Sequence, residues 1–593
     1  MIGANYIGND RCSFKVWAPE KESMILHIVH PRDEYIPMQR EEDGYWWIET
    51  NAAPGSRYFF KPNGEHDRPD PASKYQPEGV HGPSEVIDQH YEWDDEAWKS
   101  PRLKDLILYE LHIGTFTEEG TFEAVIPKLD HLLELGVNAI EIMPVSQCPG
   151  HRNWGYDGVY PYAVQNSYGG PQALKRLVEA CHQRGIAVIL DVVYNHMGPE
   201  GNYLDQFGPY FSENYKTLWG RALNYDDKWS DAVRDFFSDN ATYWFEHFHI
   251  DGLRLDAIHG VFDTSAVHFW ELMHEKIDQL QRKTGRKYFT IAESDYNNPK
   301  VIKKRDNGGF GFTAQWMDDF HHALYVLVHP EGKERYYDFN GLPHLVKAFK
   351  DGFVHSGEYV SFRKRKYGAS SADIKGNKFV VFTDNHDQSG NRLGGERLSM
   401  LVSTDKLKVA AASIILSPYI PMLFMGEEFG ASTPFLYFID HSDEWLINAV
   451  REGRREEFRD FVKEGVDFPD PQSPDVFYRS KLKWQEKNEG EHKELFEWYK
   501  QLIALRQNHS ALQNFSKKDL DVQLIENKGL MMHRRSNEKK GELVILINFS
   551  DDDLRYEPKW KKMKKILESK KCSPGKDGGI VIAPWSVSLF EID

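Results

Sequence analysis

The sequence predicts an α/β protein built around a (β/α)8 (TIM) barrel, with a β-sandwich before the barrel and a β-domain after it. Three observations support this prediction. Strand-length apolar runs fill the first 95 residues, strand-length and helix-length segments then alternate eight times, and short strands return after residue 518. We therefore expect three domains, at residues 1–95, 96–518 and 519–593.

The N-terminal region consists of short apolar and aromatic runs separated by turn residues. Clear examples are 14–17, 45–48 and 58–60, which have strand length and alternate with segments that contain glycine, proline or asparagine. Such spacing is typical of a small β-sandwich. The proline-rich stretch 67–84 is expected to connect this domain to the next one.

From about residue 103, apolar runs end in polar, acidic or aromatic residues and alternate with helix-length amphipathic segments. Eight such units in one stretch favour a closed barrel over an open sheet. The link 197–230 is long enough for a small subdomain inserted over the barrel mouth, and two further excursions span 331–375 and 430–493. The eight strand segments are 106–116, 139–145, 187–196, 252–258, 288–295, 312–318, 379–387 and 418–429.

The C-terminal region returns to strand-length runs, at 522–525, 530–534, 543–548 and 587–592. These runs predict a β-domain. Since nothing in this region indicates catalysis, the candidate functional residues are sought in the barrel.

Composition limits the classes of function. The chain has 593 residues, of which 13% are aromatic, and a net charge of −18, so it can bury a large core but would repel a nucleic-acid backbone. No apolar run reaches the roughly 18 residues that a membrane span needs, and the N-terminus has no secretory pattern. Four cysteines lie far apart without a CxxC pair, which favours reduced thiols and a cytoplasmic protein. We expect neither nucleic-acid nor membrane partners, and the oligomeric state stays open.

Four of the predicted barrel strands end in unusual polar residues. Because the C-terminal ends of barrel strands converge on one mouth, these residues are expected to lie close together. The four ends are Asp191-Val-Val-Tyr-Asn-His196, Arg254-Leu-Asp256, Glu293-Ser-Asp295 and Asp384-Asn-His386-Asp387.

Arg254 and Asp256 are two residues apart, so on a strand they point to the same side. A guanidinium beside a carboxyl group favours its ionised form, as a nucleophile requires. Glu293, from the next strand, is the expected second carboxyl group, whose pKa should rise through burial and the neighbouring anion, as suits a proton donor. Two opposed carboxyl groups of this kind are the equipment of a retaining glycoside hydrolase.

Each feature taken alone also has a structural explanation. A buried Arg–Asp pair is often a salt bridge, and a lone His196 or His386 is more often part of a core. Trp154, Tyr156 and Trp316 are ambiguous too, because most aromatic side chains are core, although flat rings at a barrel mouth also stack on sugars. Four polar ends in register around one barrel favour the functional interpretation.

These four segments resemble, in order, the signature regions of the α-amylase superfamily of glycoside hydrolases and transglycosylases. By this resemblance Asp256 is the nucleophile, Glu293 the general acid/base and Asp387 the carboxylate that stabilises the transition state. Asp191 matches the first signature aspartate, with a structural or bridging role toward Arg254. The expected substrate-binding residues are His196, Arg254, His259, His386, Trp154, Tyr156, Trp316 and Asp319.

Longer segments resemble the maltooligosyltrehalose trehalohydrolases within that superfamily. This resemblance implies an enzyme that hydrolyses the α-1,4 bond next to the terminal trehalose of maltooligosyltrehalose, releasing trehalose and a maltooligosaccharide. It implies no cofactor and no metal, although the strand-3 aspartate and Asn195 are similar to residues at the calcium site of some amylases. The segments are 151–159, 194–203, 315–322, 385–392 and 425–430.

Other functions stay open at this point. An α-1,4-glucan branching enzyme would use the same catalytic residues, with a sugar hydroxyl in place of water at the second step. An ordinary amylase or a debranching enzyme is an intermediate possibility. A non-catalytic glucan-binding protein usually lacks one of the carboxylates, whereas this chain has Asp256, Glu293 and Asp387.

Overall fold

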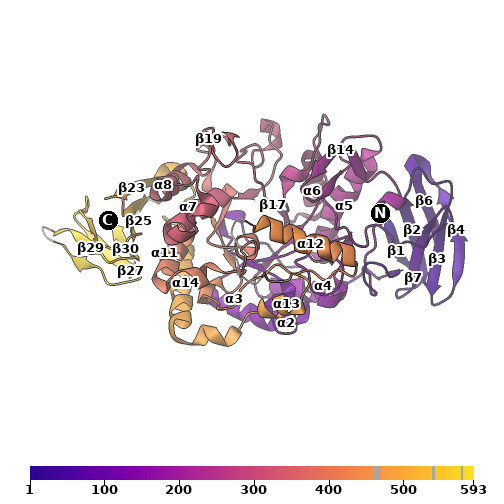
Figure 1. Ribbon diagram of the computed structural model, residues 1–593, viewed down its shortest axis with the longest axis horizontal. Coiled ribbons are helices and arrows are strands. Elements are labelled where there is room, and N and C mark those ends of the chain that lie inside the picture. The colour runs from indigo at the N-terminus through magenta and orange to yellow at the C-terminus, as the bar shows by residue number, and fades with distance from the viewer. Residues whose placement is uncertain (460–467, 537–540, 576–577, 593) are drawn as a thin grey trace.

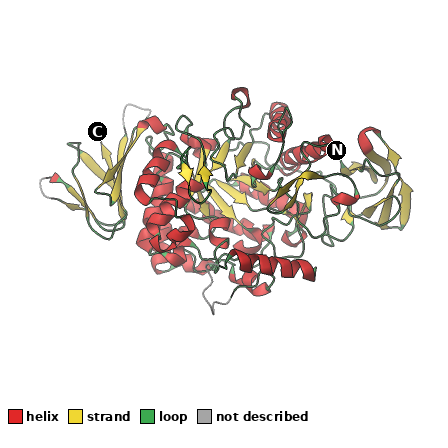
Figure 2. Ribbon diagram, turned by 45° about the horizontal axis from the view of Figure 1, so that its top comes forward, coloured by secondary structure: helices red, strands yellow, loops and turns green. Residues whose placement is uncertain are grey.

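The computed structural model describes residues 1–459, 468–536, 541–575 and 578–592. Three parts follow one another along the molecule: β-sheets at the N-terminal end, a barrel surrounded by helices in the middle, and β-sheets at the C-terminal end (Figure 1). Figure 2 shows the same order, with the helices gathered around the central strands. The predicted fold class is confirmed, and the domain limits at residues 95 and 518 stay predictions.

The N-terminal strands form two four-stranded antiparallel sheets, ordered β1-β2-β6-β5 and β4-β3-β7-β8. The rings of Phe14, from one sheet, and Tyr58, from the other, meet edge to face with centroids 4.8 Å apart, so the two sheets pack as a sandwich. The strands are β1 (Gly3–Gly8), β2 (Arg11–Trp17), β3 (Met24–His30), β4 (Glu34–Pro37), β5 (Gln39–Arg40), β6 (Tyr45–Asn51), β7 (Arg57–Pro62) and β8 (Ser84–Glu85).

Eight parallel strands form the closed barrel, and the pairing of β22 with β9 completes the ring. Each strand is shorter than its predicted segment, because the hydrogen-bond ladder ends where the chain turns into the loops of the mouth. The barrel strands are β9 (Leu108–Leu111), β10 (Ala139–Ile142), β13 (Ala187–Val192), β16 (Gly252–Leu255), β17 (Phe289–Ala292), β18 (Ala314–Trp316), β21 (Phe379–Phe382) and β22 (Ile420–Phe424).

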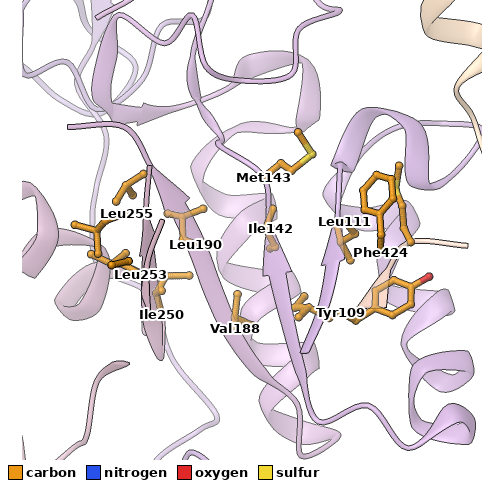
Figure 3. Packing of buried hydrophobic residues seen from close by; sticks show 14 of the residues in the cluster. Tyr109, Leu111, Ile142, Met143, Val188, Leu190, Ile250, Leu253, Leu255 and Phe424 are labelled. Atoms are coloured by element: carbon orange, nitrogen blue, oxygen red, sulfur yellow. The ribbon is translucent and has the colours of Figure 1, made fainter. Parts of the chain in front are cut away.

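Alternate side chains of these strands point into the barrel and out toward the helices. Leu108, Ala139 and Ile189 belong to an apolar cluster inside the barrel. Two residues further along each of these strands, at the same parity, the side chains are polar: Glu110, Glu141 and Asp191, with Arg254 on the adjacent β16. Residues of the other parity join the large core cluster; among them are Tyr109, Leu111, Ile142, Val188 and Leu190 (Figure 3).

Helices surround the barrel, but the fifth unit differs from the prediction. The residues between β17 and β18 form only a short 3-10 turn, η7 (Arg305–Asn307), and include Pro299 and Gly308, which disfavour a helix. The helices are α1 (Ile113–Phe116), α2 (Phe122–Val125), α3 (Leu129–Leu135), α4 (Gly170–Gln183), α5 (Ser230–Phe248), α6 (Phe269–Thr284), α7 (Asp318–Val328), α8 (Gly341–Asp351), α9 (His386–Gly390), α10 (Leu398–Leu401), α11 (Thr404–Ile415), α12 (Glu444–Glu457), α13 (Pro474–Arg479) and α14 (Gly490–Asn508).

The long links have structure of their own. The link after β13 contains a hairpin of β14 (Phe211–Thr217) and β15 (Gly220–Leu223). The first excursion contains the 3-10 segment η8 (Pro330–Tyr336), α8, and a hairpin of β19 (Tyr359–Val360) and β20 (Arg365–Lys366). The second excursion contains α12 and α13, and its residues 460–467 lie outside the described part of the chain.

The C-terminal strands form a five-stranded sheet, ordered β23-β24-β25-β30-β27, and a three-stranded sheet, ordered β26-β29-β28. The four predicted runs correspond to β23, β24, β25 and β30. Within the described ranges, no helix has the length and apolar character needed to cross a membrane. The strands are β23 (Leu520–Ile525), β24 (Gly529–Arg534), β25 (Glu542–Asn548), β26 (Leu554–Tyr556), β27 (Met563–Glu568), β28 (Ser573–Pro574), β29 (Ile580–Ile582) and β30 (Ser586–Ile592).

Candidate active site

Arg254 on β16 is the centre of a carboxylate cluster at the barrel mouth. Its Nη1 lies 2.7 Å from Oδ2 of Asp191 and 2.9 Å from Oδ1 of Asp256. Its Nη2 lies 3.6 Å from Oε2 of Glu293. Arg254 is fully buried, and a buried cation is stable only when it is paired in this way. One guanidinium therefore contacts the carboxyl groups at the ends of three adjacent strands.

The geometry allows Asp256 and Glu293 to flank one sugar. Since both contact the terminal nitrogens of one guanidinium, their nearest oxygens lie within about 9 Å of each other, a limit that includes the roughly 5 Å separation of retaining glycosidases. Their side chains are 12% and 16% exposed, whereas that of Arg254 is 0% exposed. The two carboxyl groups thus reach the open mouth, and the cation lies beneath them.

The backbone after β16 is turned so that it contacts Glu293. Ala257 has a φ of 37°, in the left-handed region that a residue with a side chain seldom adopts. Its N–H donates a hydrogen bond to Oε2 of Glu293. On the neighbouring side, Nδ2 of Asn195 donates to Oδ2 of Asp256 over 2.7 Å. Both carboxyl groups are therefore held by directed hydrogen bonds.

The surroundings of Glu293 favour its protonated form near neutral pH. Burial raises the pKa of Glu293, Arg254 opposes this effect, and the charges of Asp256 and Asp387 add to it, so that the pKa rises to about 8. A carboxylic acid that keeps its proton near pH 7 can protonate a leaving group.

Asp387 lies in the first turn of α9, directly after His386. Its side chain is 41% exposed, and its Oδ2 lies 3.5 Å from Nε2 of His386. Its Oδ1 accepts a hydrogen bond of 3.0 Å from Nδ2 of Asn391. Arg335 of η8 donates to the backbone oxygen of Asn391 over 2.8 Å, and Arg454 of α12 donates to its Oδ1 over 3.2 Å. Both long excursions thus contact the residue that holds Asp387.

Tyr156 connects His386 to the Arg254 cluster. Its hydroxyl lies 2.8 Å from Nε2 of His386 and donates to Oδ2 of Asp191 over 2.7 Å. The rings of Tyr156 and His386 are stacked, with centroids 5.1 Å apart. The predicted residues from strands 3, 4, 5 and 7 therefore meet in one network.

His196 and His259 lie on the side of the inserted hairpin. The ring of Trp219, at the tip of the β14–β15 hairpin, stacks on the ring of His196 with centroids 5.1 Å apart. His196 also donates through Nε2 to the backbone oxygen of Tyr156 over 3.1 Å. Nδ1 of His259 accepts a hydrogen bond of 3.2 Å from the backbone N–H of Asp295. The β14–β15 hairpin therefore contacts a candidate residue of the mouth through Trp219.

A cavity of about 830 Å³ opens beside these residues. Asp387 and Trp316 lie on its wall, and Ser294 and Asp295, directly after Glu293, continue it. The far wall comes from η8, the β19–β20 hairpin and the end of α12. This volume is in the range of ligand-binding pockets and can hold several sugar rings.

The catalytic-domain model of the alpha-amylase family matches residues 107–219 and 221–514. A malto-oligosyltrehalose trehalohydrolase of Saccharolobus solfataricus is 48% identical to this chain, over 86% of this chain and 87% of the relative. One of Brevibacterium helvolum is 39% identical over 99% of both chains. The chain belongs to the malto-oligosyltrehalose trehalohydrolases of the alpha-amylase family.

Two further matches place the family in context. The crystal structure of a proposed alpha amylase from Salmonella typhimurium superposes with a TM-score of 0.91 and 36% identity, over 100% of this chain and 99% of that one. A 1,4-alpha-glucan branching enzyme of Vibrio cholerae is 31% identical, but over only 61% of this chain and 55% of the relative. The trehalohydrolases match more of the chain at higher identity.

Three predicted substrate-binding residues of this trehalohydrolase family member have clear structural contacts. Trp154 is buried, donates through Nε1 to the backbone oxygen of Leu436 over 2.9 Å, and meets the ring of His386 edge to face at 5.6 Å. The guanidinium of Arg254 lies over the ring of Trp316, with its Cζ 4.3 Å from the ring centroid. Asp319 lies on the cavity wall, where its Oδ2 accepts from Nδ2 of Asn297 and from the backbone N–H groups of residues 354 and 355 over 2.7–2.8 Å. Direct contact of these three with substrate stays a prediction.

Asp318 and Glu110 are not among the candidate residues predicted from the sequence, but both lie at the site. Asp318 follows Trp316 by two residues and lines the cavity; burial, with the charge of Asp387 next, raises its pKa to about 7. Glu110 is buried on β9 and hydrogen-bonds to His386. Both residues could have been identified from the alternation of side chains along β18 and β9, because every second residue of a barrel strand points inward.

Asp191 and Asn195, which are similar to residues at the calcium site of some amylases, bind other side chains of this chain. Asp191 pairs with Arg254 and Tyr156, and Asn195 donates to Asp256. Across the described ranges, no group of three or more histidine, cysteine or acidic side chains has an arrangement that could hold a metal ion. That the reaction needs no metal stays a prediction.

Proposed function

We propose that this chain hydrolyses the α-1,4 bond next to the terminal trehalose of maltooligosyltrehalose, releasing trehalose and a maltooligosaccharide. One observation carries the chemistry: Asp256 and Glu293 share the buried Arg254 at the mouth, and burial with neighbouring anions raises the pKa of Glu293 to about 8. The names of the relatives supply the substrate.

The reaction would proceed in two steps. Glu293 gives its proton to the bridging oxygen, which leaves with trehalose, while Asp256 forms a bond to the anomeric carbon. Glu293, now ionised, then takes a proton from water, whose oxygen attacks the same carbon and releases Asp256. Two inversions leave the new reducing end in the α configuration. Asp387, open to the cavity, would hold sugar hydroxyls beside the positively charged transition state.

A branching enzyme is the second candidate, because its chemistry differs only in the acceptor of the second step. The match to the branching enzyme covers less of this chain than the matches to the trehalohydrolases. This difference favours water as the acceptor. We also propose a cytoplasmic location, with which the four free thiols agree; fractionation of cells would test it.

Product analysis tests the proposal. Purified protein would be incubated with maltooligosyltrehalose, with starch, and with pullulan, and the products would be separated by anion-exchange chromatography. We expect trehalose and one new reducing end per cleavage from the first substrate, and much slower cleavage of the other two. New α-1,6 branches would support the transferase, and equal rates on starch would indicate an ordinary amylase.

A further inference from the structure

Glu110 and Glu141 are neighbours in the barrel interior, but their surroundings differ. They are paired in register on β9 and β10, and both are 1% exposed. Neither carboxyl oxygen of Glu141 has a hydrogen-bond partner among the described residues, and burial raises its pKa well above the ordinary value. The surroundings of Glu141 thus favour its neutral form, whereas Glu110 has specific partners.

Both carboxylate oxygens of Glu110 bind the same residue. Oε1 lies 2.6 Å from Nδ1 of His386, and Oε2 accepts a hydrogen bond of 3.0 Å from the backbone N–H of His386. A carboxylate can only accept hydrogen bonds, so Nδ1 carries a proton. This two-point contact fixes the position and the rotation of the imidazole ring.

The other ring nitrogen of His386 also carries a proton. Tyr156 donates its single hydroxyl proton to Oδ2 of Asp191, so Nε2 of His386 has to donate to the oxygen of Tyr156. With protons on both nitrogens, the ring is a cation, 3.5 Å from Oδ2 of Asp387. With Asp191 and Glu110 as acceptors, this hydrogen-bond pattern is that of an imidazolium.

We propose that Glu110 is a positioning residue of this site: its carboxylate holds the side chain and the backbone of His386 together and keeps the imidazole positively charged beside Asp387. Nε2 of His386 then stays directed at the hydroxyl of Tyr156 and beside Oδ2 of Asp387, so that both side chains keep their places at the mouth. Glu110 itself is buried at the Nδ1 edge of the ring, so it acts only through His386.

The charges around His386 agree with this role. Burial would lower the pKa of His386, but Asp387 and Glu110 raise it to about 9, against the opposing charge of Arg254. Besides Glu110, the titratable and charged groups that interact with the ring from the surrounding elements are His112, Glu141, Tyr156, Asp191, Arg254 and Asp387.

The test compares Glu110→Gln with Glu141→Gln, a matched change at the paired position where the native group is already neutral. The imidazole of His386 would be titrated by NMR in the ligand-free protein, with its signal assigned through His386→Gln. In Glu110→Gln we expect the pKa of His386 to fall by about two pH units and kcat/KM for trehalose release to fall about 10- to 100-fold, mainly through kcat. Glu141→Gln should change neither.

A third variant separates charge from packing. Glu110→Asp keeps the charge, so it should keep a high pKa for His386 and recover part of the lost kcat, and it remains informative if Glu110→Gln does not fold. An unchanged titration in Glu110→Gln, or equal losses in Glu141→Gln, would overturn the proposal. The activity readout rests on the proposed function, but the titration does not, so a wild-type protein that released no trehalose would refute the function and leave Glu110 testable.

Discussion

Replacing Glu293 by Gln removes the proton donor and changes little else in the shape of the site. The amide can still accept the hydrogen bond from the N–H of Ala257. A general acid contributes about 10²- to 10⁴-fold to a rate, or roughly 3–5 kcal/mol. We therefore expect kcat for trehalose release to fall by this factor, while the melting temperature stays close to that of the wild type.

A substrate with an activated leaving group isolates the role of the proton. Fluoride leaves without protonation, so hydrolysis of a maltosyl fluoride by Glu293→Gln should be impaired less than about tenfold in the first step. Glu275→Gln, on an exposed position of α6, is the matched control and should behave as the wild type does on both substrates.

The pH profile gives an independent check of the same residue. The pKa of Glu293 is raised to about 8, and a general acid has to be protonated to act. Wild-type kcat/KM should therefore be high below this pH and should fall as the pH rises through about 8. A Glu293→Gln variant with more than a tenth of the wild-type activity on maltooligosyltrehalose, or a wild-type profile that is flat to pH 10, would refute the assignment.

Four further outcomes are expected. Asp256→Asn should lose at least about 10⁴-fold in kcat without loss of fold, because no covalent intermediate can form; near wild-type turnover would contradict the nucleophile assignment. Trp219→Ala should raise KM about fivefold with little change in kcat, because it removes an aromatic ring at the mouth whose stacking contributes about 1 kcal/mol of binding free energy. A changed kcat with constant KM would argue against this role. Dialysis against EDTA should leave activity within about twofold, as a reaction without a metal requires. Asp95→Asn should cost about 3 kcal/mol of unfolding free energy in urea titrations, because Asp95 is buried between His182, His249 and Arg286. Burial would raise the pKa of Asp95, but hydrogen bonds from the two histidines, together with the charges of His249 and Arg286, hold it below the ordinary value. The stabilisation is therefore present above the unfolded carboxyl pKa and lost as the pH falls, so wild type and variant should converge in acid.

Much of the fold could be predicted because barrel strands have simple rules. Apolar runs of the right length recur eight times, and all eight form the closed ring. The missing fifth helix could have been anticipated from Pro299 and the glycines at 308, 309 and 311, which disfavour a helix between β17 and β18. The strands and helices of the regular units depend mainly on neighbouring residues, so they can be predicted from short stretches of the sequence.

The site was predictable only in part. Asp256 and Glu293 could be recognised because each comes directly after a short strand. Each also lies two positions beyond a residue of that strand, Arg254 or Ile291, and therefore points to the same side. The contact of Asp387 with Asn391 is local, four positions along the chain. The contacts of Asn391 with Arg335 and Arg454 join residues more than 50 positions apart and depend on how two long excursions fold back onto the mouth, so no local pattern specifies them.

The double anchoring of Asn391 has a consequence for any attempt to alter this protein. The two excursions that line the cavity also hold Asn391, which hydrogen-bonds the candidate catalytic carboxylate Asp387. Loop exchanges intended to change chain-length preference would therefore also alter turnover, unless both arginine anchors are retained. We therefore expect changes in selectivity and in rate to accompany each other when these segments are altered.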